Sequence, residues 1–205
     1  MAAAARRAPI ESTAIFGDVI ARAASYSPAR VAATAIRWLD LRREHTVLEL
    51  GCGSGRLFSK VAVQVQRGFA LGVDPSPLMV RHARFRNHRF IERGFAAIET
   101  GASDDLSPFG VGRFDRVYGL HVVCFWREPR RDLAEIRRAL APGGRLLLGF
   151  CPSEHVRAAR AGDTAHCPLA CVERWLDDAG FAAIEGVVEW DGEQPLAWLS
   201  ARCRP

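Results

Sequence analysis

Short, almost uninterrupted apolar runs alternate along the chain with longer segments in which apolar residues recur every three or four positions. The first pattern is typical of buried strands and the second of helices that cover them. Five strands are predicted, at residues 45–50, 69–74, 95–100, 114–120 and 145–150. Helices are predicted at residues 55–66, 76–94, 129–140 and 168–179. The alternation predicts an α/β fold with a doubly wound, mostly parallel sheet covered by helices on both faces.

The two ends of the chain depart from this alternation. Two closing strands are predicted at residues 182–190 and 196–202, and their link, Asp191-Gly192-Glu193, is too short for a parallel crossover, so the last strand should be antiparallel. Two helices are predicted before the first strand, one over residues 12–24 and one starting at Ser27-Pro28. The second helix has one apolar face, formed by Val31, Ala35, Trp38 and Leu39.

Composition narrows the class of protein. A chain of 205 residues with 49% hydrophobic content can bury one sizeable core, so we expect a single domain over residues 1–205. Within it, residues 1–43 should form a helical lid and residues 44–205 the α/β core. No stretch approaches the roughly 20 apolar residues of a membrane span, and six cysteines without framework spacing favour free thiols. We therefore expect a cytoplasmic protein without a membrane partner.

A glycine-rich turn follows the first predicted strand. Residues 47–56 read Val-Leu-Glu-Leu-Gly-Cys-Gly-Ser-Gly-Arg, with glycines at alternate positions and Glu49 two residues before the first of them. Such a turn lets backbone N–H groups approach a ligand closely. A dinucleotide fingerprint requires a third glycine where this chain has Arg56, so the pattern argues against pyrophosphate binding.

Four motifs in order resemble class I S-adenosylmethionine-dependent methyltransferases of the type 11 group. They are the turn with Glu49, an acid at the end of the second strand (Asp74), the segment Phe114-Asp115-Arg116-Val117, and the helix-turn-strand segment 135–145. The resemblance is close over residues 44–150 and looser over 168–202. It implies a seven-stranded sheet in the order 3-2-1-4-5-7-6, S-adenosylmethionine as the cofactor and S-adenosylhomocysteine as the product.

The resemblance also implies which residues surround the cofactor. Those expected near its methionine end are Glu49, Gly51, Cys52, Gly53 and Gly55. Asp74 resembles the ribose-binding acid, although it could be merely a helix N-cap. The other residues expected at the cofactor are Pro75, Met79, Ala102, Ser103 and Leu120. The family often has an acid in place of Ala102, so the adenine contact must come from backbone, from Ser103, or from Asp104 or Asp105.

Other groups leave alternatives open. His121, at the end of the fourth strand, is the candidate general base, because neutral imidazole accepts a proton near neutral pH; it could instead only pack against the cofactor. The aromatic pair Phe125-Trp126 could wall the substrate pocket or fix the next helix to the sheet. The spacing of His155, His166, Cys167 and Cys171 lacks a regular paired-ligand pattern, so no metal site is expected.

Charge bears on the acceptor of the methyl group. The net charge is +5, and all basic residues except Lys60 are arginines, several of them on the helix at 76–94. Such a face can follow a phosphate backbone or simply face solvent. Because the basic residues are mixed with acids, we expect methyl transfer to an O, N, S or C nucleophile of a small molecule. The alternatives are an RNA or protein methyltransferase and a non-catalytic cofactor-binding scaffold.

Overall fold

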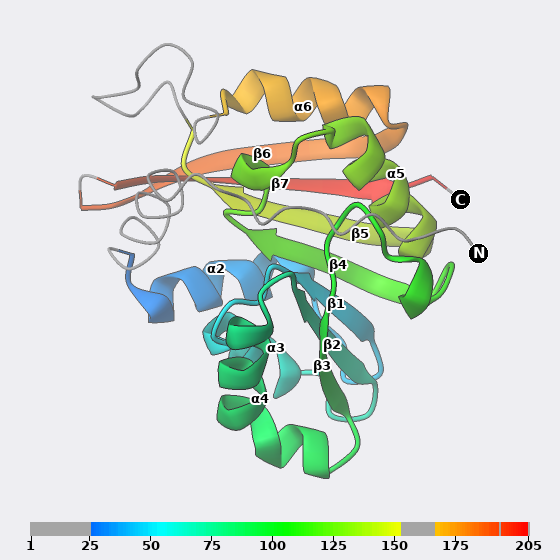
Figure 1. Ribbon diagram of the computed structural model, residues 1–205. Helices are drawn as coiled ribbons and strands as arrows, with labels where there is room; N and C mark the ends of the chain where they lie inside the picture. The colour runs from blue at the N-terminus through cyan, green and yellow to red at the C-terminus, as the bar shows by residue number, and fades with distance from the viewer. Residues whose placement is uncertain (1–25, 153–166, 193, 205) are drawn as a thin grey trace.

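A seven-stranded sheet forms the centre of the computed structural model, which describes residues 26–152, 167–192 and 194–204 (Figure 1). The strands are β1 (Thr46–Leu50), β2 (Phe69–Asp74), β3 (Ala96–Thr100), β4 (Phe114–Leu120), β5 (Leu140–Phe150), β6 (Phe181–Asp191) and β7 (Gln194–Cys203). Their order is β3-β2-β1-β4-β5-β7-β6, which is the expected one. The first five strands pair in parallel, whereas β7 is antiparallel to both β5 and β6.

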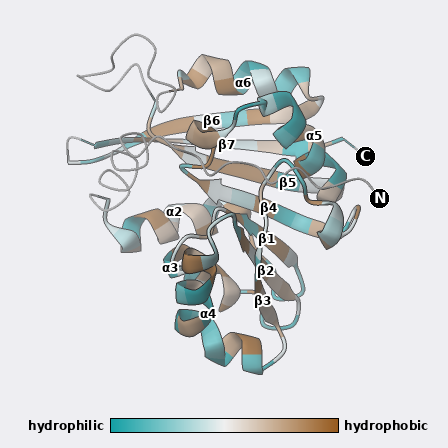
Figure 2. Ribbon diagram, viewed as in Figure 1, coloured by the Kyte–Doolittle hydropathy of each residue, from teal (hydrophilic) through white to brown (hydrophobic). Residues whose placement is uncertain are grey.

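Two hydrophobic cores lie on opposite faces of the sheet. On one face pack α2 (Pro28–Leu39), α3 (Arg56–Ala62) and α4 (Pro77–Glu92), and on the other α5 (Pro129–Ala139) and α6 (Leu169–Asp178). Neighbouring strand residues alternate between the two cores: Val47 belongs to the first and Leu48 to the second. Figure 2 shows apolar residues along the strands and polar ones on the outer helix surfaces. The near-continuous apolar strands follow from burial on both faces.

Helix α2 is joined to the far end of the chain. The carboxylates of Glu189 and Asp191, on β6, accept hydrogen bonds from the α2 region. The donors are the Ser27 N–H, Arg30, the Thr34 hydroxyl and Arg37, at 2.6 to 2.9 Å. The apolar face predicted for this helix is confirmed, since Val31, Ala35 and Leu39 are buried. The helix predicted at residues 12–24 lies outside the described residues.

The boundaries differ most from expectation at two places. Helix α3 ends at Ala62, four residues early. Strand β5 begins at Leu140, five residues before the predicted start at Arg145, and its pairing with β4 shifts between Phe114 and Arg116. Residues 141–144 form the irregularity, because Phe114 pairs with Leu140 but Arg116 pairs with Arg145. No helix within the described ranges is long and apolar enough to span a membrane.

Candidate functional site

Glycine occupies the three positions of the turn after β1 for different structural reasons. All three have positive φ, at 60° for Gly51, 52° for Gly53 and 73° for Gly55. A Cβ at Gly51 would lie 2.7 Å from the Val122 side chain, and one at Gly55 would collide with Asn87. A Cβ at Gly53 would meet no atom within 4 Å. Gly51 and Gly55 are therefore required for packing, whereas the space beside the Cα of Gly53 is open.

The carboxylate of Asp74 holds this turn against the end of β2. One oxygen accepts the Gly53 N–H at 2.8 Å and the other accepts the Ser76 N–H at 2.9 Å. Ser76 itself caps α4, by accepting the Met79 N–H. Asp74 is buried, which raises its pKa, and the two backbone hydrogen bonds oppose that shift. The N-cap of α4 is therefore Ser76 and not Asp74, and Asp74 joins the turn after β1 to the segment between β2 and α4.

Glu49 is a second buried carboxyl group, on the adjacent strand. Tyr118, its partner in the β1–β4 register, donates a hydrogen bond to it at 3.0 Å. The pKa of Glu49 is raised to about 8, chiefly by burial and also by the charge of Asp74, while the Tyr118 hydrogen bond opposes the shift. The thiol of Cys52 is also buried, and its pKa is raised by burial and by both carboxylates. This thiol is therefore a poor nucleophile near neutral pH.

The loop after β3 lies beside these groups. Its Gly101 N–H donates to the Asp74 carbonyl at 3.2 Å. The Ser103 hydroxyl donates to Asp132 on α5 at 2.5 Å, and Asp105 accepts the Ser107 hydroxyl at 2.6 Å. A surface cavity at this loop is lined by Glu99, Thr100, Gly101, Ala102, Asp104, Asp105, Pro108 and Phe109. The loop therefore carries two carboxylates, Asp104 and Asp105, close to Ala102, the position at which the family often has an acid.

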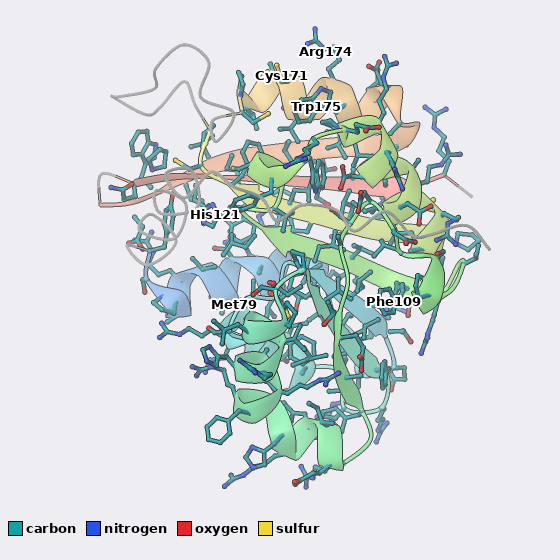
Figure 3. All side chains as sticks on the ribbon, viewed as in Figure 1. Met79, Phe109, His121, Cys171, Arg174 and Trp175 are labelled. Atoms are coloured by element: carbon teal, nitrogen blue, oxygen red, sulfur yellow. The ribbon has the colours of Figure 1, made fainter. Side chains whose placement is uncertain are left out.

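His121 follows the last residue of β4, Leu120, and lies on the same side of the molecule as Met79 (Figure 3). It is buried with a φ of 59°, which is unusual for a residue with a side chain. Its backbone N–H donates to the Gly149 carbonyl at 2.6 Å. Its ring stacks on that of Tyr26, with centroids 5.5 Å apart, and the Tyr26 hydroxyl donates to the Pro195 carbonyl. His121 is thus covered by the segment that leads into α2.

The structure indicates a packing role for the aromatic pair after His121, Phe125 and Trp126. Phe125 closes the short helix η2 (Val123–Phe125), and both Phe125 and Trp126 are partly buried against the core under α5 and α6. This arrangement agrees with the structural alternative for the pair.

Pro75, expected at the cofactor, is exposed and follows Asp74 directly, whereas Met79 is partly buried.

Several residues of the site were not singled out by their sequence. Tyr118 is identifiable only once β1 and β4 are known to be neighbours. Asn87 is buried on α4; its amide donates to the Gly55 carbonyl at 3.2 Å and its oxygen accepts the Ser59 hydroxyl at 2.6 Å. A lone polar residue on the apolar face of a helix is the signal that could have found it. In the described ranges no three His, Cys, Asp or Glu side chains form a metal-binding group, and His155 and His166 lie outside those ranges.

The strand order and the acid-and-glycine turn at the ends of β1 and β2 define the class I methyltransferase fold. Residues 48–148 match the family model described as a methyltransferase domain, and by this match and its fold the chain belongs to the class I S-adenosylmethionine-dependent methyltransferases. It is similar to a solved S-adenosylmethionine-dependent methyltransferase from Aquifex aeolicus, with a TM-score of 0.72 and 18% identity, covering 91% of this chain and 97% of that one.

Curated relatives are similar over part of their length. A putative methyltransferase from Bacillus subtilis, YrhH, is 29% identical over 112 residues, which is 55% of this chain and 61% of the relative. A tRNA U34 carboxymethyltransferase from Hahella chejuensis is 28% identical over 172 residues, which is 75% of this chain and 51% of the relative. The chain thus spans between about half and three fifths of these two relatives.

Proposed function

We propose that this protein binds S-adenosylmethionine over the carboxyl ends of β1, β2 and β4 and transfers its methyl group to an O, N, S or C nucleophile of a small molecule. The observation that carries the proposal is the pair of buried carboxyl groups, Glu49 and Asp74, at adjacent strand ends beside the open backbone of Gly53. Two such acids beside exposed backbone suit a ligand with both cationic and hydroxyl groups.

Each group has a distinct task in this proposal. Glu49 faces the cationic methionine end, where a positive charge offsets the cost of ionising a buried carboxyl group. Asp74 keeps lone pairs beyond those used by Gly53 and Ser76, and these accept the ribose hydroxyls. When bound, S-adenosylmethionine supplies an electrophilic methyl carbon on a sulfonium, and loss of that methyl leaves a neutral thioether. The chain then has mainly to align the acceptor, which is an effect of proximity and orientation.

His121 is proposed as the group that removes a proton from the acceptor. Its place after β4 is where ligands gather in an open α/β sheet. A buried residue held at positive φ is a form of backbone strain that clusters at functional sites. Tyr26 covers its ring, so the acceptor enters as this N-terminal segment moves aside. Residues 1–43 are accordingly proposed as the lid.

Binding of the cofactor tests the proposal directly. Calorimetric titration of the wild type with S-adenosylmethionine and S-adenosylhomocysteine should give one site for each. Asp74→Asn should weaken both about 10- to 100-fold, because a charge-assisted hydrogen bond is lost. Asp115→Asn is the matched control, since that carboxylate also accepts a backbone N–H, from Thr46, but at the start of β1. Absence of binding by the wild type would refute the proposed function.

RNA is the alternative acceptor, favoured by the tRNA-modifying relative and the arginine content. On α4, however, Arg84 pairs with Glu99 and Arg86 donates to the Ser54 carbonyl, so two of its arginines have partners within the chain. RNA binding would show affinity that falls steeply with salt. If the protein methylates compounds of a small-molecule panel and shows no salt-dependent affinity for RNA, RNA is excluded as the acceptor.

A further inference from the structure

A surface cavity of about 840 Å³ lies between α5, the end of α6 and the end of β7. Four arginines line it: Arg130, Arg137 and Arg138 come from α5, and Arg204 directly follows β7. Among the described residues, Asp178 contributes the single carboxylate of the lining. The volume is that of a small-molecule site, and the lining is strongly basic.

The cavity is remote from the turn after β1 and from His121. At the end of β7, Arg202 pairs with Arg145, which in turn pairs with Arg116 near the start of β4. His121 follows the opposite end of β4. The end of the chain marked C in Figure 1 accordingly lies on the side of the molecule away from His121, which Figure 3 labels in the same view. The cavity is therefore separate from the proposed cofactor site.

Two of the four arginines are held within the chain. Arg138 donates to both oxygens of Glu135, at 2.7 and 3.1 Å, so its charge is balanced by that carboxylate. Arg137 donates to the Ala179 carbonyl at 3.2 Å. A carbonyl accepts a hydrogen bond without cancelling a positive charge, and a guanidinium has five N–H donors. Arg137 thus keeps its charge and further donors in the wall of the cavity.

The other two arginines have a weak partner or none. Arg130 approaches Asp178 only to 4.0 Å, and its side chain is 90% exposed, so the pair contributes little. Arg204 is exposed, and no hydrogen bond or ion pair is found for it in the part of the chain that the structure describes. Once Glu135 and Asp178 are counted against the four arginines, two positive charges remain in excess.

The placement of these charges indicates the kind of ligand. Arg130 and Arg137 are seven residues apart, about 10 Å along the helix axis, and Ala134 lies exposed between them. Charges spread over this length match a ligand with more than one anionic group. Guanidinium groups suit phosphate because their planar N–H groups bind its oxygens in pairs. The described lining holds no aromatic side chain on which a nucleobase could stack.

We propose that this cavity is a second binding site, for a small polyanion that carries two or more phosphate groups in a row. Arg137, fixed by the Ala179 carbonyl, and the exposed Arg130 and Arg204 bind the phosphate oxygens, and the small side chain of Ala134 leaves room for the ligand. The inference goes beyond the proposed function, because the cavity shares no residue with the proposed cofactor site.

Calorimetric titration with inorganic tripolyphosphate tests this at an ionic strength of about 0.15 M, without divalent cations. The wild type should bind one tripolyphosphate, and inorganic phosphate about tenfold or more weakly. The double variant Arg130→Gln and Arg204→Gln should weaken tripolyphosphate about tenfold or more, because charge-assisted hydrogen bonds are lost. The matched control is Arg89→Gln with Arg93→Gln, two exposed arginines at the end of α4, which should stay within about twofold.

A second test spares every arginine. Ala134→Glu places a carboxylate among the cavity arginines, whereas Ala134→Gln adds a side chain of the same shape without the charge. Both residues are good helix formers and the position is exposed, so thermal unfolding should be little changed. Ala134→Glu should bind tripolyphosphate about tenfold or more weakly than Ala134→Gln. Equal affinities in the two variants would overturn the proposal.

Competition locates the anion. Tripolyphosphate should bind equally well with and without saturating S-adenosylhomocysteine; displacement by that compound would place the anion at the turn after β1 and overturn the proposal. Failure of the wild type to bind tripolyphosphate, or equal weakening in the two double variants, also overturns it, as would a single-stranded RNA that binds more tightly and displaces tripolyphosphate. Binding of tripolyphosphate by a wild type that does not bind S-adenosylhomocysteine would support this site and refute only the proposed function.

Discussion

At the scale of single residues, Glu49 combines deep burial with a hydrogen bond from a neutral donor. Tyr118 lessens the cost of ionisation but does not remove it, and Asp74 adds a second negative charge nearby. Within the described residues no ion pair to Glu49 is found. A pKa raised to about 8 favours the protonated carboxyl group near neutral pH, and a cation bound beside it would favour the ionised form, as the proposed function requires.

Replacing Glu49 by glutamine should stabilise the protein without ligand at alkaline pH. The folded pKa of about 8 exceeds the ordinary value of 4.5, so the folded state holds a proton that the unfolded state releases. Wild-type stability should therefore fall as pH rises from about 4.5 to 8. Glu49→Gln lacks this loss. Its free energy of unfolding should therefore exceed that of the wild type by an amount that grows across this pH range to about 2–4 kcal/mol.

Urea unfolding at pH 5, 7 and 9 measures this difference. Glu99→Gln is the control, because Glu99 is exposed and paired with Arg84. An advantage of Glu49→Gln that is the same at all three pH values would contradict the burial argument.

His121 gives a prediction about rate. His121→Asn, chosen because asparagine tolerates positive φ, should lower the turnover number about 100-fold at saturating cofactor if the imidazole removes a proton. The Kd for S-adenosylmethionine should change less than about threefold. Steady-state kinetics with the acceptor found by panel screening decides whether His121 removes a proton or only packs. His82→Asn on α4 is the control. Unchanged turnover would leave His121 a packing residue.

At the scale of elements, the turn after β1 shows why a glycine pattern alone underdetermines a site. Strand β2, the start of α4 and the class of turn are all predictable, because apolar runs and the Ser76-Pro77 start signal are local. Which of the glycines packing requires depends on Val122 and Asn87, residues far along the chain. No local pattern carries that information.

The two kinds of glycine should respond differently to the same substitution. Gly55→Ala should destabilise the protein by about 2–4 kcal/mol, because a Cβ at positive φ would also collide with α4. Gly53→Ala should cost only about 1 kcal/mol, yet weaken cofactor binding about tenfold or more by narrowing the open approach. Denaturant unfolding and calorimetry on both variants check this. Equal losses of stability would contradict the assignment.

At the scale of the whole molecule, α2 joins the start of the described chain to its last hairpin. The hydrogen bonds to Glu189 and Asp191 cross more than 150 positions of sequence and hold the segment that bears Tyr26 over His121. This arrangement covers the His121 ring, on the side from which the acceptor enters in the proposed function.

Loosening that junction should separate stability from cofactor binding. The double variant Glu189→Gln and Asp191→Asn should lose about 1–2 kcal/mol of stability, because its pairs are partly exposed and each contributes little. Cofactor affinity should stay within about threefold, while KM for the acceptor changes. Urea unfolding, calorimetry and kinetics measure the three quantities, with Glu44→Gln, an exposed pair with Arg67, as control. A large loss of cofactor affinity would place the junction in the cofactor site instead.

The sequence by itself determined the strands, most helix starts, the antiparallel last strand and, through resemblance, the strand order and the cofactor class. These follow from local signals, since apolar runs, caps and turn residues act over a few positions. Only the tertiary structure decided the Glu49–Tyr118 pair, the hold of Asp132 on Ser103 and the cover of Tyr26 over His121. Each joins residues at least 29 positions apart. Such contacts arise from how strands and helices pack, so no local pattern predicts them.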